Sequence, residues 1–174
     1  MAATSWEYSL RPCGPGDEEK LALVGAASFL EAFAGFLPGE DVLLHCWNQH
    51  SPKKYAAMLA DAETHACVAE VKDAPVGYAL VCPPDLPVPL TPDDIELKRI
   101  YLLHRFQGSG IGAALMDWSI EKARSLGKRR LVLGVNAENK AVEFYQRQGF
   151  ERAGTRSFQV GNTICKDFIL ARNI

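Results

Sequence analysis

The spacing of hydrophobic residues along this 174-residue chain switches repeatedly between the two-residue period of strands and the 3.6-residue period of helices. Strand-like spacing covers residues 8–11, 65–71, 76–82, 95–102, 131–135, 153–160 and 164–170. Helical spacing covers residues 17–29, one or two stretches within 38–60, and the segments 111–126 and 139–149. Elements in this order predict a mixed α/β domain whose sheet is part antiparallel and part parallel.

Proline, glycine and helix-capping residues indicate where these elements should begin and end. Five prolines fall within residues 83–94, which can form neither a helix nor an inner strand, so we expect a stiff loop there. Residues 72–75 and the pair Gly161-Asn162 have the composition of hairpin turns. Three helix starts are marked by Asp17, Ser51 and Asn139.

The segment 102–112 joins a strand-like run to a helical run and contains glycines at alternate positions, Gly108, Gly110 and Gly112. Glycine has no Cβ, so a ligand can approach the backbone closely. A helix start also leaves N–H groups unpaired and carries a partial positive charge. These features together predict a cradle for an anion, most often a phosphate, and the alternative is a tight turn that binds nothing.

The same glycines fit the G-x-G-x-x-A phosphate fingerprint of dinucleotide-binding domains, which would make the protein a nicotinamide-dependent oxidoreductase. That fold places the motif early in a repeated parallel array and an acidic residue about 20 positions later. Here hairpin-like strands precede the motif, and the corresponding positions are Lys128, Arg129 and Arg130. Only 62 residues follow Gly112, too few for a second nucleotide-binding half, so the oxidoreductase is the weaker alternative.

Composition narrows the class of protein further. The chain length fits a single domain over residues 1–174, and a hydrophobic content of 48% is a globular value. No apolar run approaches the ~20 residues that cross a bilayer, and residues 1–10 lack a signal-peptide pattern. The five cysteines are widely spaced without a C-x-x-C pair, so we expect no disulfides, no metal site and a reduced, cytoplasmic protein.

Charge is unevenly distributed, although the net value is only −2. Residues 1–100 contain 15 acidic and 7 basic side chains, whereas residues 101–174 contain 6 acidic and 12 basic ones. A basic half that includes the glycine-rich junction suits an anionic cofactor, and an acidic half suits a cationic partner. Basic and aromatic residues do not interleave in a stripe, so nucleic acid is not an expected partner. A membrane is not an expected partner either, because no apolar run is long enough to span one.

Three motifs follow one another in the second half of the chain: residues 96–102 (ELKRIYL), Gln107-x-x-Gly110-x-Gly112, and residues 139–150 (NKAVEFYQRQGF). In sequence, order and spacing they resemble the GCN5-related N-acetyltransferase (GNAT) family, in which the second motif is the coenzyme A pyrophosphate loop. Further similarity at residues 95–102, 133–135 and 157–161 points to the PaiA-like acetyltransferases, which act on polyamines and other small amines. Residues 1–90 match only loosely.

The resemblance implies a GNAT-type fold with a central mixed, mostly antiparallel sheet flanked by helices on both faces. It implies an acetyl-CoA-binding core at 95–150, acceptor-side helices, strands and loop at 1–94, and C-terminal strands at 151–174. The implied activity is direct transfer of acetyl from acetyl-CoA to a small-molecule, polyamine-like amine. A non-catalytic module that binds coenzyme A and an acetyltransferase for a protein or amino-acid amine stay open.

Cofactor binding is expected at the glycine-rich junction and the strand before it. Charge-assisted bonds from the backbone N–H groups of residues 107–112 would anchor the pyrophosphate, each contributing about 1.5–3 kcal/mol. A strand splayed after Leu102 would leave an N–H free to polarise the thioester carbonyl. The complete implied set for acetyl-CoA is Ile100, Tyr101, Leu102, Gln107, Gly108, Ser109, Gly110, Ile111, Gly112, Asn139 and Tyr145.

Acetyl transfer to an amine needs a base and an acid. Alkyl amines have a pKa of about 10, so a base must remove a proton before attack. The resemblance points to Glu96, for which an ion pair with Lys98 or Arg99 is the alternative role. It assigns protonation of the leaving thiolate to the Tyr145 phenol, which could otherwise be a core aromatic. Asn139 would contact the pantetheine arm, cap a helix, or do both.

The acceptor side is less defined by the sequence. Four aromatic residues could shape a pocket or simply pack in the core: Phe29, Phe33, Phe36 and Trp47. Three acidic residues of the proline-rich loop could attract a cationic acceptor or remain solvated: Asp85, Asp93 and Asp94. The four histidines are weaker candidates for the base, and three of them lie near the expected site: His45, His50 and His104. Exposed terminal strands could pair between two copies, so a homodimer is a further expectation.

Overall fold

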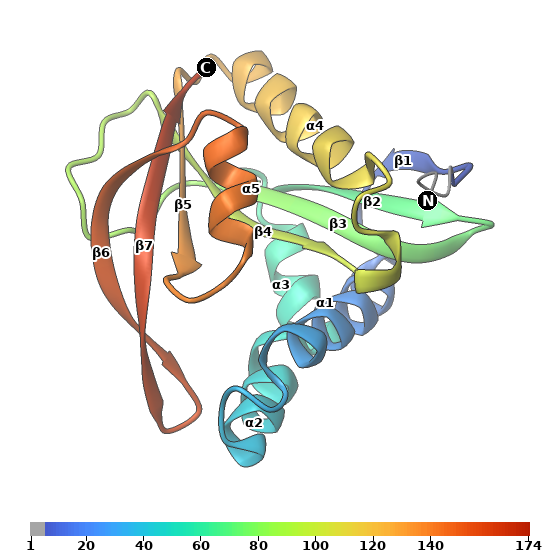
Figure 1. Cartoon of the computed structure of the whole chain (residues 1–174). Coiled ribbons are helices and arrows are strands. Elements are labelled where there is room, and N and C mark those ends of the chain that lie inside the picture. Colours follow the sequence, from blue (N-terminus) through green and yellow to red (C-terminus); the bar gives the residue numbers. More distant parts are fainter. Residues whose placement is uncertain (1–5) are drawn as a thin grey trace.

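The computed structural model describes residues 6–174, so the part of the signal-peptide expectation that concerns residues 1–5 lies outside the described residues. In chain order the elements are β1 (Ser9–Pro12), α1 (Glu18–Phe33), α2 (Gly39–Gln49), α3 (Pro52–Ala60), β2 (His65–Val71), β3 (Ala74–Cys82), β4 (Asp94–Leu102), the short 3-10 helix η1 (His104–Phe106), α4 (Ile111–Ser125), β5 (Arg130–Asn136), α5 (Ala141–Arg147), β6 (Glu151–Val160) and β7 (Thr163–Asn173) (Figure 1).

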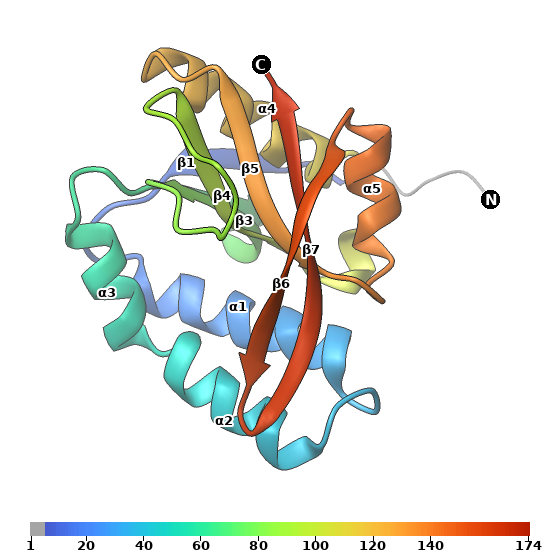
Figure 2. The same cartoon turned by 90° about the vertical axis from the view of Figure 1, so that its left-hand side faces the viewer.

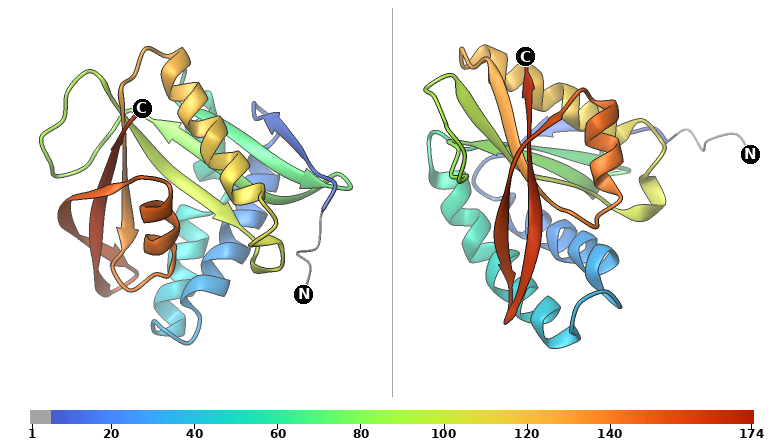
Figure 3. Two further views of the ribbon diagram at one scale, coloured as in Figure 1. Left: turned by 45° about the horizontal axis from the view of Figure 1, so that its top comes forward. Right: turned by 60° about the vertical axis from the view of Figure 1, so that its left-hand side comes forward.

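The strands form one seven-stranded sheet in the order β1-β2-β3-β4-β5-β7-β6 within the described residues. Neighbouring strands are antiparallel except for β4 and β5, which are parallel. Helix α4 packs on β2, β3 and β4 from one face, and α1 packs on β3 and β4 from the other, with α2 and α3 against α1 (Figures 1 and 3). The predicted mixed, mostly antiparallel sheet with helices on both faces is confirmed.

A hydrophobic core on each face of the sheet holds the helices in place. Under α4, the fully buried side chains of Ile111, Leu115 and Met116 join those of the central strands. The opposite core joins α1 and α3 to the sheet through residues such as Leu21 and Tyr55. Each large side chain buried in this way contributes about 1.5–3 kcal/mol to stability. No helix within residues 6–174 has the length and apolar character needed to cross a membrane.

The β6–β7 hairpin reaches past the sheet, and its tip lies beside α2 (Figure 2). The Asp41 carboxylate in the first turn of α2 accepts hydrogen bonds from the Asn162 N–H (2.7 Å) and the Thr163 hydroxyl (2.6 Å). Gly161 has a φ of 55°, and the predicted Gly161-Asn162 turn is confirmed. This anchor connects the C-terminal strands to the helices of the first third of the chain.

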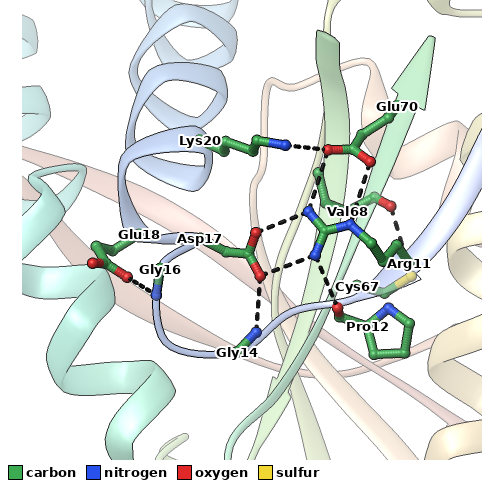
Figure 4. Close-up of polar contacts among 10 residues, drawn as sticks. All are labelled: Arg11, Pro12, Gly14, Gly16, Asp17, Glu18, Lys20, Cys67, Val68 and Glu70. Atoms are coloured by element: carbon green, nitrogen blue, oxygen red, sulfur yellow. Dashed lines mark hydrogen bonds and ion pairs between the residues drawn. The ribbon is translucent and has the colours of Figure 1, made fainter. Parts of the chain in front are cut away.

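An ion cluster fixes the start of α1 against β1 and β2 (Figure 4). The Arg11 guanidinium donates to the carboxylates of Asp17 (2.8 Å) and Glu70 (3.2 Å), and the Lys20 ammonium lies 2.6 Å from Glu70. Asp17 occupies the N-cap position, as predicted, but its carboxylate accepts from Arg11 and from the Gly14 N–H instead of the first turn of α1. Competition by the guanidinium explains why the side-chain cap is absent.

Some predicted boundaries differ from the structure because strand pairing extends elements beyond their hydrophobic pattern. Strand β3 begins at Ala74, so the hairpin turn contains only Lys72 and Asp73, with φ of 49° and 65°. This is the conformation of a two-residue type I′ turn. Strand β4 begins at Asp94, which takes that residue out of the proline-rich loop. The Ser51 cap is confirmed, since its hydroxyl accepts from the Lys54 N–H.

Candidate active site

The parallel ladder between β4 and β5 is short. Residues 94–96 of β4 pair with residues 130–132 of β5, and beyond Glu96 the two strands diverge (Figure 3). A cavity of about 280 Å³ lies where they separate. The sequence predicted a splay after Leu102, which is wrong: the strands separate six residues earlier, so the N–H groups that point toward β5 lose their partner strand already within β4.

A β-bulge in β4 accompanies the divergence. In the β3–β4 ladder Val81 pairs with Leu97 and Leu80 pairs with Arg99, so Lys98 is an extra residue with no partner in β3. An inserted residue bends its strand and shifts the alternation of side chains that follow it. The amino-acid pattern of β4 gives no sign of the bulge, because all of its positions are compatible with a regular strand.

The bulge decides which side chains of β4 share a face. Leu97 and Ile100 both pack in the core under α4, although regular alternation would place residues three positions apart on opposite faces. Glu96 and Arg99 therefore lie together on the other face, which is turned toward α1, α2 and α3. A buried carboxylate and a guanidinium thus reach the same cavity.

The cavity brings together residues that the sequence predicted as site residues from three different motifs. Seven of them line it: Glu96, Ile100, Tyr101, Leu102, Gln107, Asn139 and Tyr145. A second cavity of about 380 Å³ shares seven lining residues with the first, and Leu102, Gln107 and Asn139 are the predicted site residues among them. The remaining predicted residues, 108–112, do not line either cavity and form the loop and first turn of α4 that follow Gln107.

The glycine-rich junction has the backbone geometry of an open loop that starts a helix. Gly108 and Gly110 have φ of 75° and 91°, and a Cβ added at either would meet nothing within 4 Å. The Ala114 N–H donates to the Gly110 carbonyl at 3.0 Å, so the N–H groups of residues 111–113 precede the first intrahelical bond. No backbone carbonyl in the described part of the chain accepts from the N–H groups of residues 108–110.

This junction fits the diphosphate of coenzyme A. A diphosphate needs several N–H donors that point into open space. This helix start supplies consecutive unpaired N–H groups, and the two left-handed glycines leave the space in front of them free of side chains. Two hydrogen bonds fix the position of the loop. The Leu103 N–H donates to the Val76 carbonyl (2.9 Å), and the Gln107 side-chain amide donates to the Leu102 carbonyl (3.3 Å). The donors are therefore arranged before any ligand arrives.

Glu96 is buried, with an exposed fraction of 1%, at the end of the β4–β5 ladder. One carboxylate oxygen accepts from the Asp85 N–H (2.9 Å), and the other lies 3.5 Å from the Lys98 ammonium. The sequence offered an ion pair with Lys98 or Arg99 as an alternative role for Glu96. The pair with Lys98 is present, and in the described residues Glu96 forms no ion pair with Arg99. A carboxylate at the cavity wall can also accept a proton from a bound amine.

Tyr145 is buried on α5 and lines the cavity from the side of β5. Its ring packs edge-on against Phe144 and Phe150, at centroid distances of 5.4 and 5.8 Å, so the core role is also real. Burial raises the pKa of the Tyr145 phenol above its usual value near 10, which keeps the proton available for donation. The Asn139 side chain accepts from the Ala141 N–H (2.8 Å), but the N-cap of α5 is Lys140, so the predicted N-cap position is wrong by one residue.

The side of the cavity that faces α2 and α3, where the sequence leads us to expect the acceptor, is a cluster of aromatic and basic residues from α2, α3 and the sheet. His50 Nδ1 lies 2.8 Å from the Tyr55 hydroxyl, which is also hydrogen-bonded to the Tyr78 hydroxyl. The Arg99 guanidinium lies over the Tyr55 ring, 4.8 Å from its centroid. Burial and the nearby Arg99 charge lower the pKa of His45 to about 4 and of His50 to about 3. Both imidazoles are neutral at physiological pH and are weak bases.

Sequence reasoning did not single out several residues on this side. The missed cavity residues include Ser28, Arg99 and Arg156, and Tyr55 and Tyr78 form the layer behind them. One signal was available: Arg99 and Tyr101 are two positions apart in a strand, so their side chains share a face. The partners on α1 and α3 come from distant parts of the chain and leave no local pattern.

Other candidates are placed away from the cavity or only beside it. Trp47 is 67% exposed and lines neither cavity, so both roles considered for it, a pocket residue and a core residue, are wrong. Phe36 and His104 line only the second cavity, whereas Phe29 and Phe33 line the first. Asp94 is 2% exposed and pairs with Arg130 at 2.7 Å, so it does not attract an acceptor. Asp85 and Asp93 are exposed and line neither cavity.

One cysteine, Cys82, lies next to Glu96 in the sheet. Cys82 pairs with Glu96 across the β3–β4 ladder, and burial raises the pKa of its thiol to about 11, which keeps it a poor nucleophile. Residues 6–174 contain no group of three or more His, Cys, Asp and Glu side chains arranged to hold a metal ion.

Comparison with known proteins agrees with this geometry. Residues 26–150 match the family model described as acetyltransferase (GNAT) family. An uncharacterised N-acetyltransferase of Mycobacterium bovis is 31% identical over 159 residues, which cover 91% of this chain and 98% of that protein. An uncharacterised N-acetyltransferase of Methanocaldococcus jannaschii is 40% identical over 86 residues, which cover 48% of this chain and 38% of that protein.

Solved structures share the fold over nearly the whole chain. The PaiA N-acetyltransferase of Thermoplasma acidophilum, in complex with coenzyme A, has a TM-score of 0.79 at 18% identity and covers 97% of this chain and 99% of that one. The ribosomal-protein-S18-alanine N-acetyltransferase of Escherichia coli has a TM-score of 0.71 at 19% identity and covers 97% and 94%. The chain belongs to the GNAT acetyltransferase family, whose members transfer acetyl groups from acetyl-CoA to amines.

Proposed function

We propose that this protein acetylates a small-molecule amine, which attacks the thioester of acetyl-CoA directly in the cavity between β4 and β5. The observation that carries this proposal is the convergence of Glu96, Tyr145 and a strand with unpaired N–H groups on one cavity. Direct attack is favoured over a covalent enzyme intermediate because the thiol nearest to Glu96 in the ladder, Cys82, stays protonated.

We propose that residues 1–174 form one acetyltransferase domain in which three segments have different roles. Residues 95–150 hold acetyl-CoA, residues 1–94 hold the acceptor, and residues 151–174 complete the sheet. The strand order supports this division of labour within one domain, because β7 pairs with both β5 and β6 and β4 is flanked by β3 and β5.

Acetyl-CoA is assigned to the glycine-rich junction and to the cavity next to it. The N–H groups of residues 108–112 would hold the diphosphate. The Gln107 N–H, which the sequence also assigned to it, already donates to the His104 carbonyl (3.1 Å). The Asn139 amide would contact the pantetheine arm. Backbone N–H groups near Ile100 to Leu102 would stabilise the negative charge that develops on the thioester oxygen. The support for this last role is the early end of the β4–β5 ladder, which leaves that part of β4 without a partner on the β5 side.

Two side chains are assigned to proton transfer. Glu96 would take a proton from the acceptor ammonium, directly or through a water, so that the nitrogen lone pair can attack. Tyr145 would give its proton to the departing thiolate, whose conjugate thiol has a pKa of about 8.5. The support is burial at the cavity wall for both groups and the raised pKa of the phenol.

The acceptor class is the least constrained part of the proposal. The resemblance to PaiA-like enzymes favours a polyamine-like amine, and a protein or amino-acid amine is the alternative. The structural neighbours do not choose between them, because one is named for PaiA and another for the alanine of a ribosomal protein. The free state of all five cysteines supports a reducing compartment such as the cytoplasm. A homodimer through an edge strand stays a prediction.

A thiol-release assay tests the proposal. Purified protein is mixed with acetyl-CoA and each member of a small-amine library that includes spermidine, and free coenzyme A is measured. We expect release only when an amine is present, and we expect acetyl-CoA to raise the melting temperature. Stabilisation by acetyl-CoA without turnover on any amine would favour a non-catalytic coenzyme A module. Stabilisation by NAD(H) or NADP(H) and none by coenzyme A would favour the oxidoreductase and overturn the proposal.

A further inference from the structure

Three buried polar atoms within residues 6–174 have no hydrogen-bond partner, and all three belong to residues that line the cavity between β4 and β5. They are Ser28 Oγ, His50 Nε2 and Arg99 Nη1. Buried polar groups in folded proteins are nearly always paired, because an unpaired one costs about 1–3 kcal/mol. Three such atoms around one cavity indicate hydrogen-bonding capacity that a ligand can use.

The charged side chains that line this cavity carry an excess of positive charge. Five charged side chains line it, and four of them form two ion pairs: Lys98 with Glu96 (3.5 Å) and Arg156 with Asp167 (3.0 Å). The fifth is Arg99, and in the part of the chain that the structure describes no carboxylate lies within ion-pair distance of it. The cavity therefore carries one uncompensated positive charge on the acceptor side.

Arg99 is held in position by the side chains around it. Its guanidinium lies over the Tyr55 ring, and the bulge at Lys98 places it on the same face as Glu96. His50 is 4% exposed and neutral, so it neither competes for an anion as a second cation nor supplies a negative counter-charge. A planar guanidinium with free N–H donors is the side chain best suited to a carboxylate.

We propose that the acceptor amine also carries a carboxylate, as in an amino acid or a related small aminocarboxylate, and that Arg99 binds this carboxylate. The inference rests on the proposed acetyltransferase function, and it selects the amino-acid alternative over the polyamine-like acceptor that the resemblance favours. A polycationic acceptor would face the uncompensated Arg99 charge in a low-dielectric cavity, which weakens its binding. A carboxylate compensates that charge, while the amine is left to meet Glu96, which lies three positions from Arg99 along β4.

Matched acceptors test the inference on the unmodified protein. Each amine is used in three forms: the α-amino acid or ω-aminocarboxylate, its carboxamide, and the amine without the carboxyl group. Thiol release with acetyl-CoA gives kcat/KM for each, and spermidine is included. We expect the carboxylate form to exceed its carboxamide by roughly tenfold or more, as a charge-assisted hydrogen bond would produce. Equal rates for the two forms, or a preference for spermidine, would overturn the inference.

An Arg99→Met variant tests the assigned residue. We expect the ratio of carboxylate to carboxamide kcat/KM to fall to within about twofold of one, and Arg99→Lys to retain part of it. Arg124 lies on α4 away from the cavity with an exposed side chain, so Arg124→Met is the matched control and should keep the full ratio. An unchanged ratio in Arg99→Met would contradict the assignment to Arg99.

Binding of the product separates this inference from the proposed function. The coenzyme A complex is titrated calorimetrically with N-acetylated amino acids and with their amides, which requires no turnover. Tighter binding of the acids supports a carboxylate site even if no amine in the panel is acetylated, in which case the proposed function fails alone. If amines without a carboxyl group are acetylated and neither measurement shows a preference for carboxylates, the proposed function stands and the inference is overturned.

Discussion

Glu96 of β4 and Val132 of β5 form the last pair of the parallel ladder at the centre of the sheet. The carboxylate of Glu96 therefore lies where the two strands part, at the edge of the cavity that their separation creates. Residues 94–96 of β4 pair with β5, and this pairing holds Glu96 in place. The residues of β4 after Glu96 have no partner on the β5 side, so their backbone N–H groups are available as donors. The proposed base and the proposed oxyanion donors thus depend on one structural event, the end of a ladder.

The first prediction concerns this carboxylate. Glu96→Gln keeps the side-chain size and the ability to accept from the Asp85 N–H, but it cannot take a proton. We expect kcat to fall by about 10²–10⁴-fold, the range for loss of a general base, with little change in acetyl-CoA affinity. Steady-state thiol release and calorimetry measure the two quantities. Glu143 is exposed on α5, so Glu143→Gln serves as control; wild-type kcat in Glu96→Gln would remove the base assignment.

The second prediction concerns the phenol. Tyr145→Phe keeps the ring that packs on Phe144 and Phe150 and removes only the hydroxyl. We expect kcat to fall by about 10²-fold or more, while the Kd for acetyl-CoA stays within about twofold. Because the pKa of Tyr145 is raised, its proton is present throughout the neutral and moderately alkaline range, so the wild-type rate should not decline there through loss of this acid. Equal activity in the variant would exclude Tyr145 as the acid.

The third prediction concerns the left-handed glycine that opens α4. Gly110 has a φ of 91°, so Gly110→Ala strains the loop and turns its N–H groups away from the ligand; we expect acetyl-CoA affinity to fall by roughly tenfold or more. Gly127, at the other end of α4, has a φ of 73°. Gly127→Ala carries the same backbone cost of about 1–2 kcal/mol without touching the junction.

Thermal unfolding and calorimetry separate the two glycine variants. Both should lower the melting temperature in the absence of ligand, but only Gly110→Ala should lose most of the stabilisation that acetyl-CoA provides. If both variants bound acetyl-CoA like the wild type, the glycine-rich junction would not be the diphosphate site.

The fourth prediction concerns pH and the cluster around Arg11. Hydrogen bonds from Arg11 lower the pKa of the Asp17 and Glu70 carboxyls, so the folded protein binds these protons less readily than the unfolded chain. Their stabilisation is complete above the unfolded pKa values of about 4 and is lost as the pH falls below them. We expect Glu70→Gln to lower the melting temperature by several degrees at pH 7, and the difference from wild type to shrink below about pH 4.

Thermal melts from pH 7 to pH 3 measure this effect. Glu63 is an exposed residue in the loop after α3 without an ion pair among the described residues, so Glu63→Gln is the control and should behave like the wild type at every pH. A Glu70→Gln deficit that is independent of pH would show that the carboxylate acts through packing and not through its charge.

The elements with strong periodic patterns could be predicted from sequence, and those shaped by strand pairing could not. The buried strand at residues 131–135 and the helix that starts at Ile111 follow directly from local hydrophobicity and from the glycines. The bulge at Lys98 could not be foreseen, because it arises from the register between β3 and β4. That register sets the face of Arg99, and hence the charge of the proposed acceptor side.

The site shows the same division. Gln107, Asn139 and Tyr145 belong to contiguous motifs, and the resemblance of those motifs to the GNAT family points to them. Trp47 was misplaced because the helical pattern of its segment does not reveal which of its apolar residues face solvent, and the structure leaves it 67% exposed. Asp94 was assigned to a loop, since its pairing with Arg130 becomes visible only when β4 and β5 are brought together.

Hydrogen exchange of backbone amides, with and without acetyl-CoA, is the most direct test of how this protein holds its acyl donor. Saturating acetyl-CoA should slow exchange at residues 108–112, whose N–H groups would hold the diphosphate, and in the unpaired part of β4 near Ile100 to Leu102. Binding of acetyl-CoA that left both segments exchanging as in the free protein, or protected a different surface, would contradict the assignment of this cavity as the site of acetyl transfer.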